Sequence, residues 1–287
     1  MAEPADRTKS GNVSEESKIR LLSFDDFPFA QTVRKIAGWN QTDTDWRRLV
    51  EHAPEGCFLI EHDGKPAGTA TTTSYGTDLA WIGMVLVHPE FRRLGLATAL
   101  LNHCLNYLLV EKKVRCVKLD ATPDGQKVYE KLGFQVEYGL ARWERNSEPF
   151  DENPNRGQIE IPSYKLDHIA FGADRSKFLD QMLQNSSRSI SIDECFGTIR
   201  EGMSAAYLGP VISDDRKIGE RIISDLISTS PSSHIFWDIF DDNPDAIRLA
   251  ESLGFIKQRK LIRMWTGDSN LADRPEFQWA IGGPETG

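Results

Sequence analysis

The sequence predicts an α/β protein with mixed sheets, built from two copies of one folding unit in tandem. Short apolar runs typical of strands alternate with stretches of helical spacing along most of the chain. Residues 120–134 recur in recognisable form at 241–255, and a segment rich in Pro, Asn and Gly separates the copies. We therefore expect two domains, each a central mixed sheet flanked by helices. The expected divisions are a flexible tail at 1–17, a first domain at 18–146, a linker at 147–163 and a second domain at 164–287.

Within the first half, the two periodicities alternate clearly. Strands are expected at 19–22, 57–61, 66–74, 79–87, 114–120 and 134–143. Helices are expected at 25–37, from Thr44 or Asp45 to Val50, at 94–110, and in a segment ending at Leu132, where Gly133 supplies a left-handed stop. The second half gives weaker signals, with strands predicted at 165–169 and 203–212 and a helix at 176–185.

The internal repeat gives the strongest indication of a duplicated fold. Residues Asp120–Phe134 align without gaps to Asp241–Phe255, and seven of the fifteen positions are identical. Upstream, Val87, Arg92 and Gly95 match Val211, Arg216 and Gly219 at a constant offset of 124. One fold for both halves follows from these matches.

Composition excludes several classes of partner. Lys and Arg total 34 against 43 Asp and Glu, a formal charge of −9, so we expect neither nucleic acid nor an anionic membrane as a partner. The four cysteines are scattered without a CxxC pair, which argues against a structural metal or a disulfide framework. The polar first 17 residues are unlike a secretory signal, and no apolar run approaches a membrane span. A cytoplasmic location is the prediction.

One segment, 84–98, has the pattern of an anion site. An apolar strand stops at Pro89, and a short loop leads into a helix whose first turn contains Gly95 and Ala97. Free backbone N–H groups at a helix start bind phosphate, and small residues let the phosphate approach. An ordinary strand–loop–helix junction has a similar pattern. The later Tyr129-x-x-x-Gly133-Phe134 makes the combination more specific.

Arg92-x-x-Gly95-x-Ala97 after a strand, followed by this tyrosine motif, resembles the GNAT superfamily of acyl-CoA N-acyltransferases. The resemblance covers 18–146 well and 164–267 weakly. It implies two GNAT-like domains, with acetyl-CoA as co-substrate, no metal, and transfer to a primary amine, which we expect to belong to a small molecule. It also implies a pantetheine arm bound along Val85 and Val87. The implied pyrophosphate site consists of the backbone of Arg92, Arg93, Leu94, Gly95, Leu96, Ala97 and Thr98.

The resemblance gives Tyr129 the role of general acid toward the departing thiolate. Many relatives carry a catalytic carboxylate on the fourth strand, but residues 82–85 offer none. Asp120 is the first candidate for the general base, since burial would raise its pKa, although an aspartate there can equally cap the following turn. His88 is a weaker alternative, and the amine could arrive already neutral.

Trp39, Asn40 and Trp46 lie in the region that shapes the acceptor site in this superfamily, although Trp46 could equally belong to the core. The second copy has Glu220 and Arg221 opposite Leu96 and Ala97, and Ala250 in place of Tyr129. We therefore expect it not to bind the cofactor, but to shape the acceptor cleft or an interface, such as that of a homodimer. The alternative functions are a non-catalytic acyl-CoA sensor or interaction module and a protein lysine acetyltransferase.

Overall fold

The computed structural model describes residues 16–146, 163–230, 232–271 and 273–287. The predicted linker therefore falls almost wholly outside the described residues, as do the first fifteen residues of the predicted tail. The first half contains β1 (Ser17–Leu21), α1 (Phe27–Ile36), α2 (Asp43–His52), β2 (Cys57–His62), β3 (Lys65–Tyr75), β4 (Leu79–Val87), α3 (Leu96–Leu105), β5 (Cys116–Ala121), α4 (Pro123–Lys131) and β6 (Gln135–Asn146).

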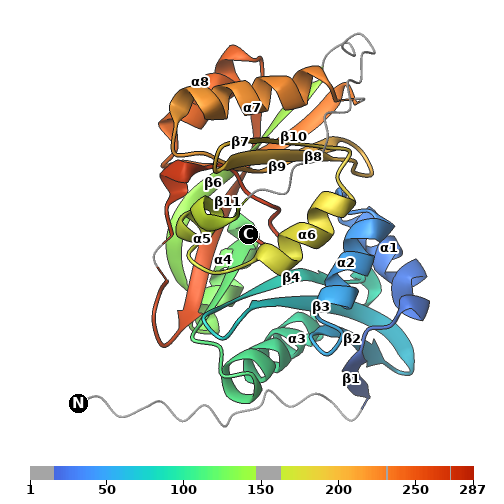
Figure 1. Cartoon of the computed structure of the whole chain (residues 1–287). Helices are drawn as coiled ribbons and strands as arrows, with labels where there is room; N and C mark the ends of the chain where they lie inside the picture. Colours follow the sequence, from blue (N-terminus) through green and yellow to red (C-terminus); the bar gives the residue numbers. More distant parts are fainter. Residues whose placement is uncertain (1–15, 147–162, 231, 272) are drawn as a thin grey trace.

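The second half repeats this order in outline. It contains α5 (Lys165–Phe171), α6 (Ser176–Gln184), β7 (Arg188–Ile192), β8 (Cys195–Arg200), β9 (Ala206–Ile212), α7 (Arg216–Ser228), β10 (His234–Phe240), α8 (Pro244–Ser252), β11 (Ile256–Gly267) and β12 (Gln278–Ala280). Helices cover the sheet on both sides, and α6 lies where the two halves meet, close to α2 (Figure 1).

The two halves share one mixed sheet, in which they exchange their last long strands. The strand order is β1-β2-β3-β4-β5-β11-β6-β10-β9-β8-β7, with β12 added against β9. Strand β11 of the second half therefore pairs with β5 of the first, and β6 of the first half pairs with β10 of the second. This exchange makes the sheet continuous across both repeats, so neither repeat is a closed unit.

Three local predictions need correction. Residues 165–169 form part of helix α5 and not a strand, because Leu166 and Ala170 are buried at helical spacing. The helix expected at 94–110 begins at Leu96 and is followed by a π-helical segment from Asn106 to Glu111. The hairpin of β7 and β8 was not predicted.

The segment 281–287, which we call the inner segment, passes through the interior between the halves, where Figure 1 marks the end of the chain. Four side chains of the surrounding elements bind its backbone, among them Arg200, whose Nη2 donates to the carbonyl of Gly282 at 2.7 Å. Tyr75 Oη donates to the carbonyl of Thr286 at 2.7 Å, Trp81 Nε1 to that of Pro284 at 3.0 Å, and Arg175 Nη1 to that of Gly287 at 2.8 Å. This segment therefore helps to join the two halves.

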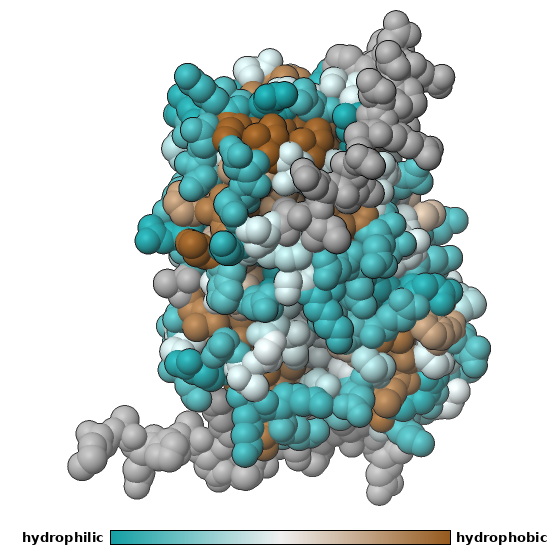
Figure 2. Space-filling model, in the orientation of Figure 1, coloured by the Kyte–Doolittle hydropathy of each residue, from teal (hydrophilic) through white to brown (hydrophobic). Residues whose placement is uncertain are grey.

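The face of the molecule in Figure 2 is mostly hydrophilic, with small hydrophobic areas between polar side chains. Among the described residues, none of the helices has the length and apolar character needed to cross a bilayer.

Candidate active site

Strands β4 and β5 separate part of the way along β4. They pair in parallel only from Leu79 to Trp81, opposite Cys116 to Lys118. Strand β4 continues to pair with β3 as far as Val87, but beyond Trp81 its other edge has no partner strand in the described structure. Such an edge presents N–H and C=O groups that an extended ligand can bind as an added strand.

A cleft opens beside this edge. Residues Ile82 to Val85 of β4 form one wall, and Tyr129 of α4 contributes from the side of β5. Trp39 and the inner segment, through Pro284 and Glu285, also line the cleft, as does Asp120 at the end of β5. Side chains from both halves of the chain thus meet in one cavity.

The N-terminus of α3 has the geometry of an anion site. Gly95 is the N-cap in the left-handed conformation, φ 80°, and no side chain caps the helix. The first hydrogen bond runs from Ala99 N–H to the Gly95 carbonyl, so the amides of residues 96–98 have no partner within the helix. Arg92 Nε donates to the carbonyl of Val87 at 3.3 Å, which holds this guanidinium at the end of β4.

Tyr129 lines the cleft from α4, with its ring 5.9 Å from that of Phe134 in an edge-on contact. Its hydroxyl makes no hydrogen bond to any described residue. Burial raises the pKa of Tyr129 to about 12. The phenol is therefore protonated at neutral pH and free to donate its proton to a ligand.

The geometry of Asp120 argues against its expected role as general base. Its two carboxylate oxygens accept from Arg263 Nε at 2.9 Å and Nη2 at 3.0 Å, and both side chains are fully buried. Burial raises the pKa of Asp120, while Arg263 opposes that shift. Asp238 forms the same arrangement with Arg142 across β10 and β6. Asp120 thus belongs to one of two equivalent ion pairs, Asp120–Arg263 and Asp238–Arg142, that join the exchanged strands.

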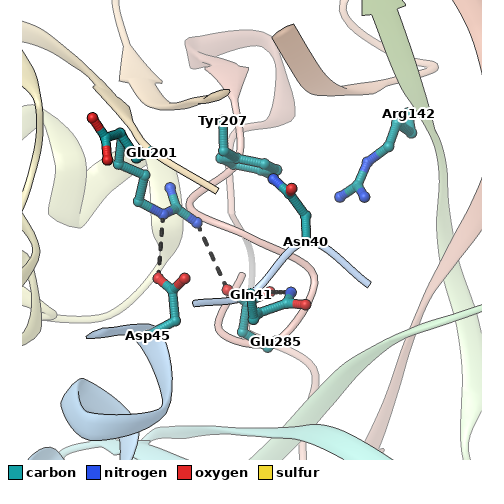
Figure 3. A pocket seen from close by; sticks show the side chains of 8 residues that line it. Asn40, Gln41, Asp45, Arg142, Glu201, Tyr207 and Glu285 are labelled. Atoms are coloured by element: carbon teal, nitrogen blue, oxygen red, sulfur yellow. Dashed lines mark hydrogen bonds and ion pairs between the residues drawn. The ribbon is translucent and has the colours of Figure 1, made fainter. Parts of the chain in front are cut away.

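Glu285 is a carboxylate in the cleft that sequence analysis missed. Its Oε2 accepts from Gln41 Nε2 at 2.8 Å, its Oε1 lies 3.7 Å from Arg200 Nη2, and burial raises its pKa. Figure 3 shows Glu285 beside Gln41 and near Asp45 in a smaller polar cavity that adjoins the cleft. A Cβ on Gly83 would lie 2.4 Å from the Glu285 carbonyl oxygen, so glycine in β4 lets this segment pass.

No local signal in the sequence points to Glu285, because it lies far along the chain from β4 and outside both recurring motifs. The one indirect sign is Gly83 itself, a residue without a side chain in the middle of an apolar strand. Such a glycine often marks the close approach of another backbone.

The three expected acceptor residues have different positions. Trp39 lines the cleft and is half-buried. Trp46 is fully buried in the core between α1, α2 and the sheet, so the expectation that it contacts an acceptor is withdrawn. Asn40 is also buried; its Oδ1 accepts from the amides of Ser204 and Ala205, and its Nδ2 donates to the Ala205 carbonyl. Asn40 therefore ties the two halves together and has little left to offer a ligand.

Two arginines of the exchanged strands also line the cleft and were not predicted. Arg142 on β6 is held by Asp238, which accepts in addition from Tyr207 Oη at 2.9 Å. Arg259 on β11 is placed directly opposite Arg142 in the register of the two strands. They reach the cleft only because β6 and β11 cross between the halves.

The equivalent position in the second half is filled by the chain itself. Strands β9 and β10 pair in parallel only from Ala206 to Leu208, as in the first half, but β12 then pairs with β9. The Trp279 indole packs so closely on α7 that a Cβ at Gly219 would be 2.5 Å from it. Asp215 caps α7 by accepting from Ile218 N–H at 3.0 Å.

The predicted obstacles to cofactor binding in the second half were Glu220 and Arg221. Both instead lie on the outer surface of α7, where Glu220 binds Arg216 and Arg221 approaches Asp225. Ala250, the counterpart of Tyr129, is buried in the core. The strand β12 and the Asp215 cap give better physical reasons for expecting no cofactor there.

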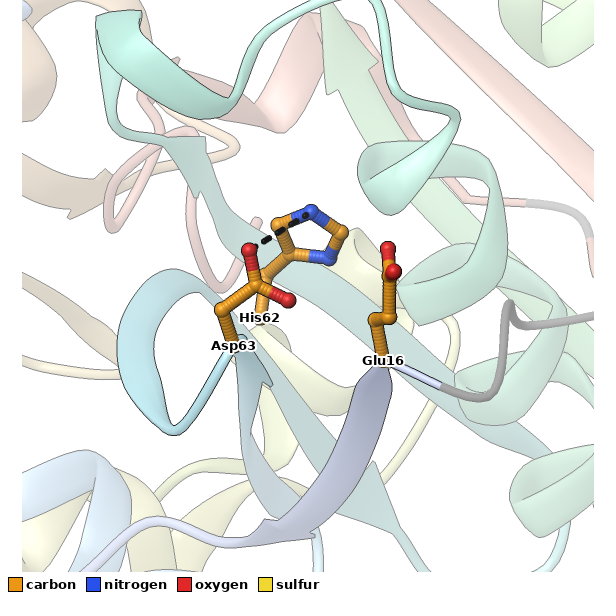
Figure 4. A group of neighbouring side chains, drawn as sticks. All are labelled: Glu16, His62 and Asp63. Atoms are coloured by element: carbon orange, nitrogen blue, oxygen red, sulfur yellow. Dashed lines mark ion pairs between the residues drawn. The ribbon is translucent and has the colours of Figure 1, made fainter.

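One group of potential metal ligands occurs in the described structure, namely Glu16, His62 and Asp63 (Figure 4). Its candidate ligand atoms lie within 4.8 Å of one another, at the edge formed by β1 and β2. One ring nitrogen of His62 is already engaged, since Nδ1 is 2.7 Å from Ser17 Oγ. The group does not line the cleft, and exposed acidic residues often gather without an ion, so we assign it no metal.

Comparison with known proteins identifies the family. The model of the acetyltransferase (GNAT) family matches residues 20–134, and that of an acetyltransferase (GNAT) domain matches residues 164–280. The chain therefore belongs to the GNAT acetyltransferase family and carries two GNAT domains in tandem, which confirms the expected family and fold class.

Individual relatives agree with this assignment. The chain is 28% identical over 163 residues to the uncharacterized N-acetyltransferase YitH of Bacillus subtilis (strain 168), a match that covers 52% of this chain and 56% of that protein. A proposed acetyltransferase of Pyrococcus horikoshii has the same fold over 96% of this chain and 98% of its own, with a TM-score of 0.82 and 22% identity. A tandem GNAT protein from the clavulanic acid biosynthesis pathway aligns over 89% and 99%, with a TM-score of 0.60 and 12% identity.

Proposed function

We propose that this protein is an N-acetyltransferase that moves the acetyl group of acetyl-CoA to the primary amine of a small molecule, in the cleft of the first half. One observation carries the proposal. The unpaired edge of β4 and Tyr129, whose hydroxyl is free, line the opening between β4 and β5, and the uncapped N-terminus of α3 follows the end of β4 along the chain. Family membership supports acyl transfer as the reaction.

The residues present fit acetyl-CoA. Its pyrophosphate would be held by the backbone amides from Arg92 to Thr98, of which those of 96–98 have no partner within the helix. The backbone of Val85 and Val87, on the edge of β4 without a partner strand, would pair with the pantetheine arm. When bound, acetyl-CoA supplies the activated acetyl thioester.

Two side chains of the cleft can move the protons that the reaction requires. Tyr129 holds a proton on its phenol oxygen at neutral pH and can donate it to the leaving thiolate. Glu285 replaces Asp120 as the proposed base, because burial raises its pKa and only one of its oxygens is bound by Gln41. It would accept a proton from the attacking amine, directly or through one water.

A small acceptor agrees better with this cleft than a protein lysine, because Trp39 and the inner segment enclose it from two sides. All the residues in this proposal come from one chain, so a homodimer is not needed for it. Homodimer formation and a cytoplasmic location remain predictions.

The test is the substitution Tyr129→Phe, with Tyr107→Phe on the π-helical segment as a matched control. We expect kcat, measured as release of the CoA thiol, to fall by about 10²- to 10⁴-fold, as for loss of a general acid. The Kd of acetyl-CoA from calorimetry should not change, because in this proposal the hydroxyl would act only on the departing sulfur.

A non-catalytic acyl-CoA sensor is the competing function. It would show acetyl-CoA binding without turnover of any amine in the wild-type protein. Equal kcat values for Tyr129→Phe and the wild type would show that Tyr129 is not the general acid. A loss of acetyl-CoA affinity as large as the loss of kcat would show that Tyr129 is a binding residue.

A further inference from the structure

The cleft contains a guanidinium without an ion-pair partner among the described residues, and its position bears on the choice of acceptor if the proposed function holds. Arg259 lines the cleft, yet no carboxylate of the described residues forms an ion pair with it. Its Nε is buried without a hydrogen-bond partner. Burial lowers the pKa of Arg259, as does the like charge of Arg142, and Asp238 opposes these effects only in part.

The buried arginines around the cleft, in contrast, all have partners. Arg142 binds both oxygens of Asp238, and Arg263 binds both oxygens of Asp120. Arg200 lies within ion-pair distance of Asp45 and Glu285. Because burial of an unpaired charge is costly, Arg259 is the one guanidinium of this set that an incoming anion would stabilise.

The anion could come from the cofactor or from the acceptor. In antiparallel neighbours, directly opposed residues point to the same face, so Arg259 shares a face of the sheet with Arg142. Arg142 also lines the polar cavity that contains Glu285. Helix α3, which would hold the phosphates, packs through Leu96 and Leu100 in the core on the other face. The anion that pairs with Arg259 therefore belongs more readily to the acceptor than to the cofactor.

We propose that the acceptor carries a carboxylate close to its amine, as an amino acid does, and that Arg259 binds this carboxylate. A guanidinium pairs with a carboxylate through two parallel hydrogen bonds, which fixes the position of the acceptor as well as attracting it. Glu285 lines the same cleft and would receive the proton of the amine. The charges of the cleft thus match a zwitterionic acceptor.

The test compares matched acceptors on the wild-type protein. The probes are the free L-amino acids, their carboxamides, and simple neutral amines, each with acetyl-CoA and thiol release as the readout. We expect at least one amino acid to have a kcat/KM about 10- to 100-fold above that of its carboxamide, the size of a charge-assisted contact. The ammonium group of a carboxamide has a lower pKa than that of the matching amino acid, so at a given pH more of the carboxamide is present as free amine. A faster reaction of the amino acid therefore cannot result from a difference in protonation.

The variant Arg259→Gln should remove the preference by raising the KM of the amino acid, while the Kd of acetyl-CoA stays constant. Arg259→Lys should restore part of the preference. The control is Lys260→Gln, which removes an exposed charge from the next residue of β11, on the opposite face. A raised Kd for acetyl-CoA in Arg259→Gln would instead assign Arg259 to a cofactor phosphate and overturn the inference.

The outcomes separate this inference from the proposed function. Equal or faster turnover of carboxamides and neutral amines would overturn the carboxylate preference and leave the acetyltransferase standing. No turnover of any probe, with acetyl-CoA bound, would overturn the proposed function and this inference together.

Discussion

In both halves of this chain, two parallel strands pair over three positions and then separate. In the described structure, the space between the separated strands is empty of other strands in the first half and filled in the second. In the first half, β4 and β5 pair at three positions and then separate around an accessible cleft. In the second half, β9 and β10 pair at three positions and then separate around β12. The helix that follows also differs, because α3 begins without a side-chain cap while Asp215 caps α7.

One stretch of chain produces this difference. Residues 278–280 close the opening of the second half, and a few residues later Pro284 and Glu285 line the cleft of the first half. The same segment thus removes a cofactor site from one repeat and adds a carboxylate to the other. The two copies therefore have different roles, because the first keeps an open cleft and the second supplies a carboxylate that lines it.

The largest expected effect comes from placing a charge in the open site. Ala97→Glu puts a carboxylate in the first turn of α3, where the phosphates would lie. Two unit charges of like sign 4 Å apart repel by about 4 kcal/mol at an effective dielectric constant of 20, so acetyl-CoA affinity should fall about 1,000-fold. Calorimetric titration measures this loss.

The matched control is Arg221→Glu at the aligned position of α7, whose side chain is 72% exposed. It should leave one acetyl-CoA bound per chain. Two sites per chain in the wild type, or loss of binding in Arg221→Glu, would contradict the assignment of the cofactor to the first half.

The next effect concerns the strand that fills the second opening. Trp279 is fully buried, and replacement of a buried tryptophan by alanine costs about 3–5 kcal/mol. Trp279→Ala should therefore lower the free energy of unfolding by this amount in urea denaturation, while the half-buried Trp39→Ala lowers it much less. Acetyl-CoA stoichiometry should remain at one, because Asp215 still caps α7; a second site would show that β12 alone keeps the cofactor out.

A smaller effect, about 100-fold in kcat, is expected for Glu285→Gln. Burial raises the pKa of Glu285 above its ordinary 4.5, and a general base must be deprotonated to act. Activity should thus be lost as pH falls through this pKa, in addition to the loss caused by protonation of the amine itself. Because the pKa of Tyr129 is about 12, no loss is expected on the alkaline side at ordinary pH.

The pH–rate profile of kcat/KM measures this contribution. At acidic pH, kcat/KM of the wild type should fall as two groups gain a proton, Glu285 and the amine. In Glu285→Gln it should fall as the amine alone gains one. Glu276→Gln, an exposed carboxylate of the same region, serves as the control and should keep both. An unchanged profile in Glu285→Gln would mean that the amine arrives neutral without a protein base.

The sequence allowed the family, the duplication and most first-half elements to be predicted, because these depend on short-range patterns. The glycines that end α4 and α8 are at φ 90° and 80°, as a left-handed stop requires, so Gly133 and Gly254 could be interpreted from their neighbours alone. Gly95 and Tyr129 could be singled out in the same way, since each belongs to a motif of a few residues.

The acceptor side could not be predicted in this way. Trp46 and Asn40 have the composition of a binding site, but one is in the core and the other joins the halves. Asp120 could be a base or a structural residue until Arg263 was placed beside it by the exchange of β11. Periodicity says which residues of a strand share a face, but not which strand will be its neighbour.

The sequence by itself determined the repeated unit, the loop at the start of α3 and the tyrosine of α4, because these rest on local backbone preferences and side-chain spacing. Only the tertiary structure decided which opening stays open, and it alone brought Glu285, Arg142 and Arg259 to the cleft. The physical reason is that strand pairing and the path of the inner segment minimise the free energy of the whole sheet, through contacts between residues far apart in the chain.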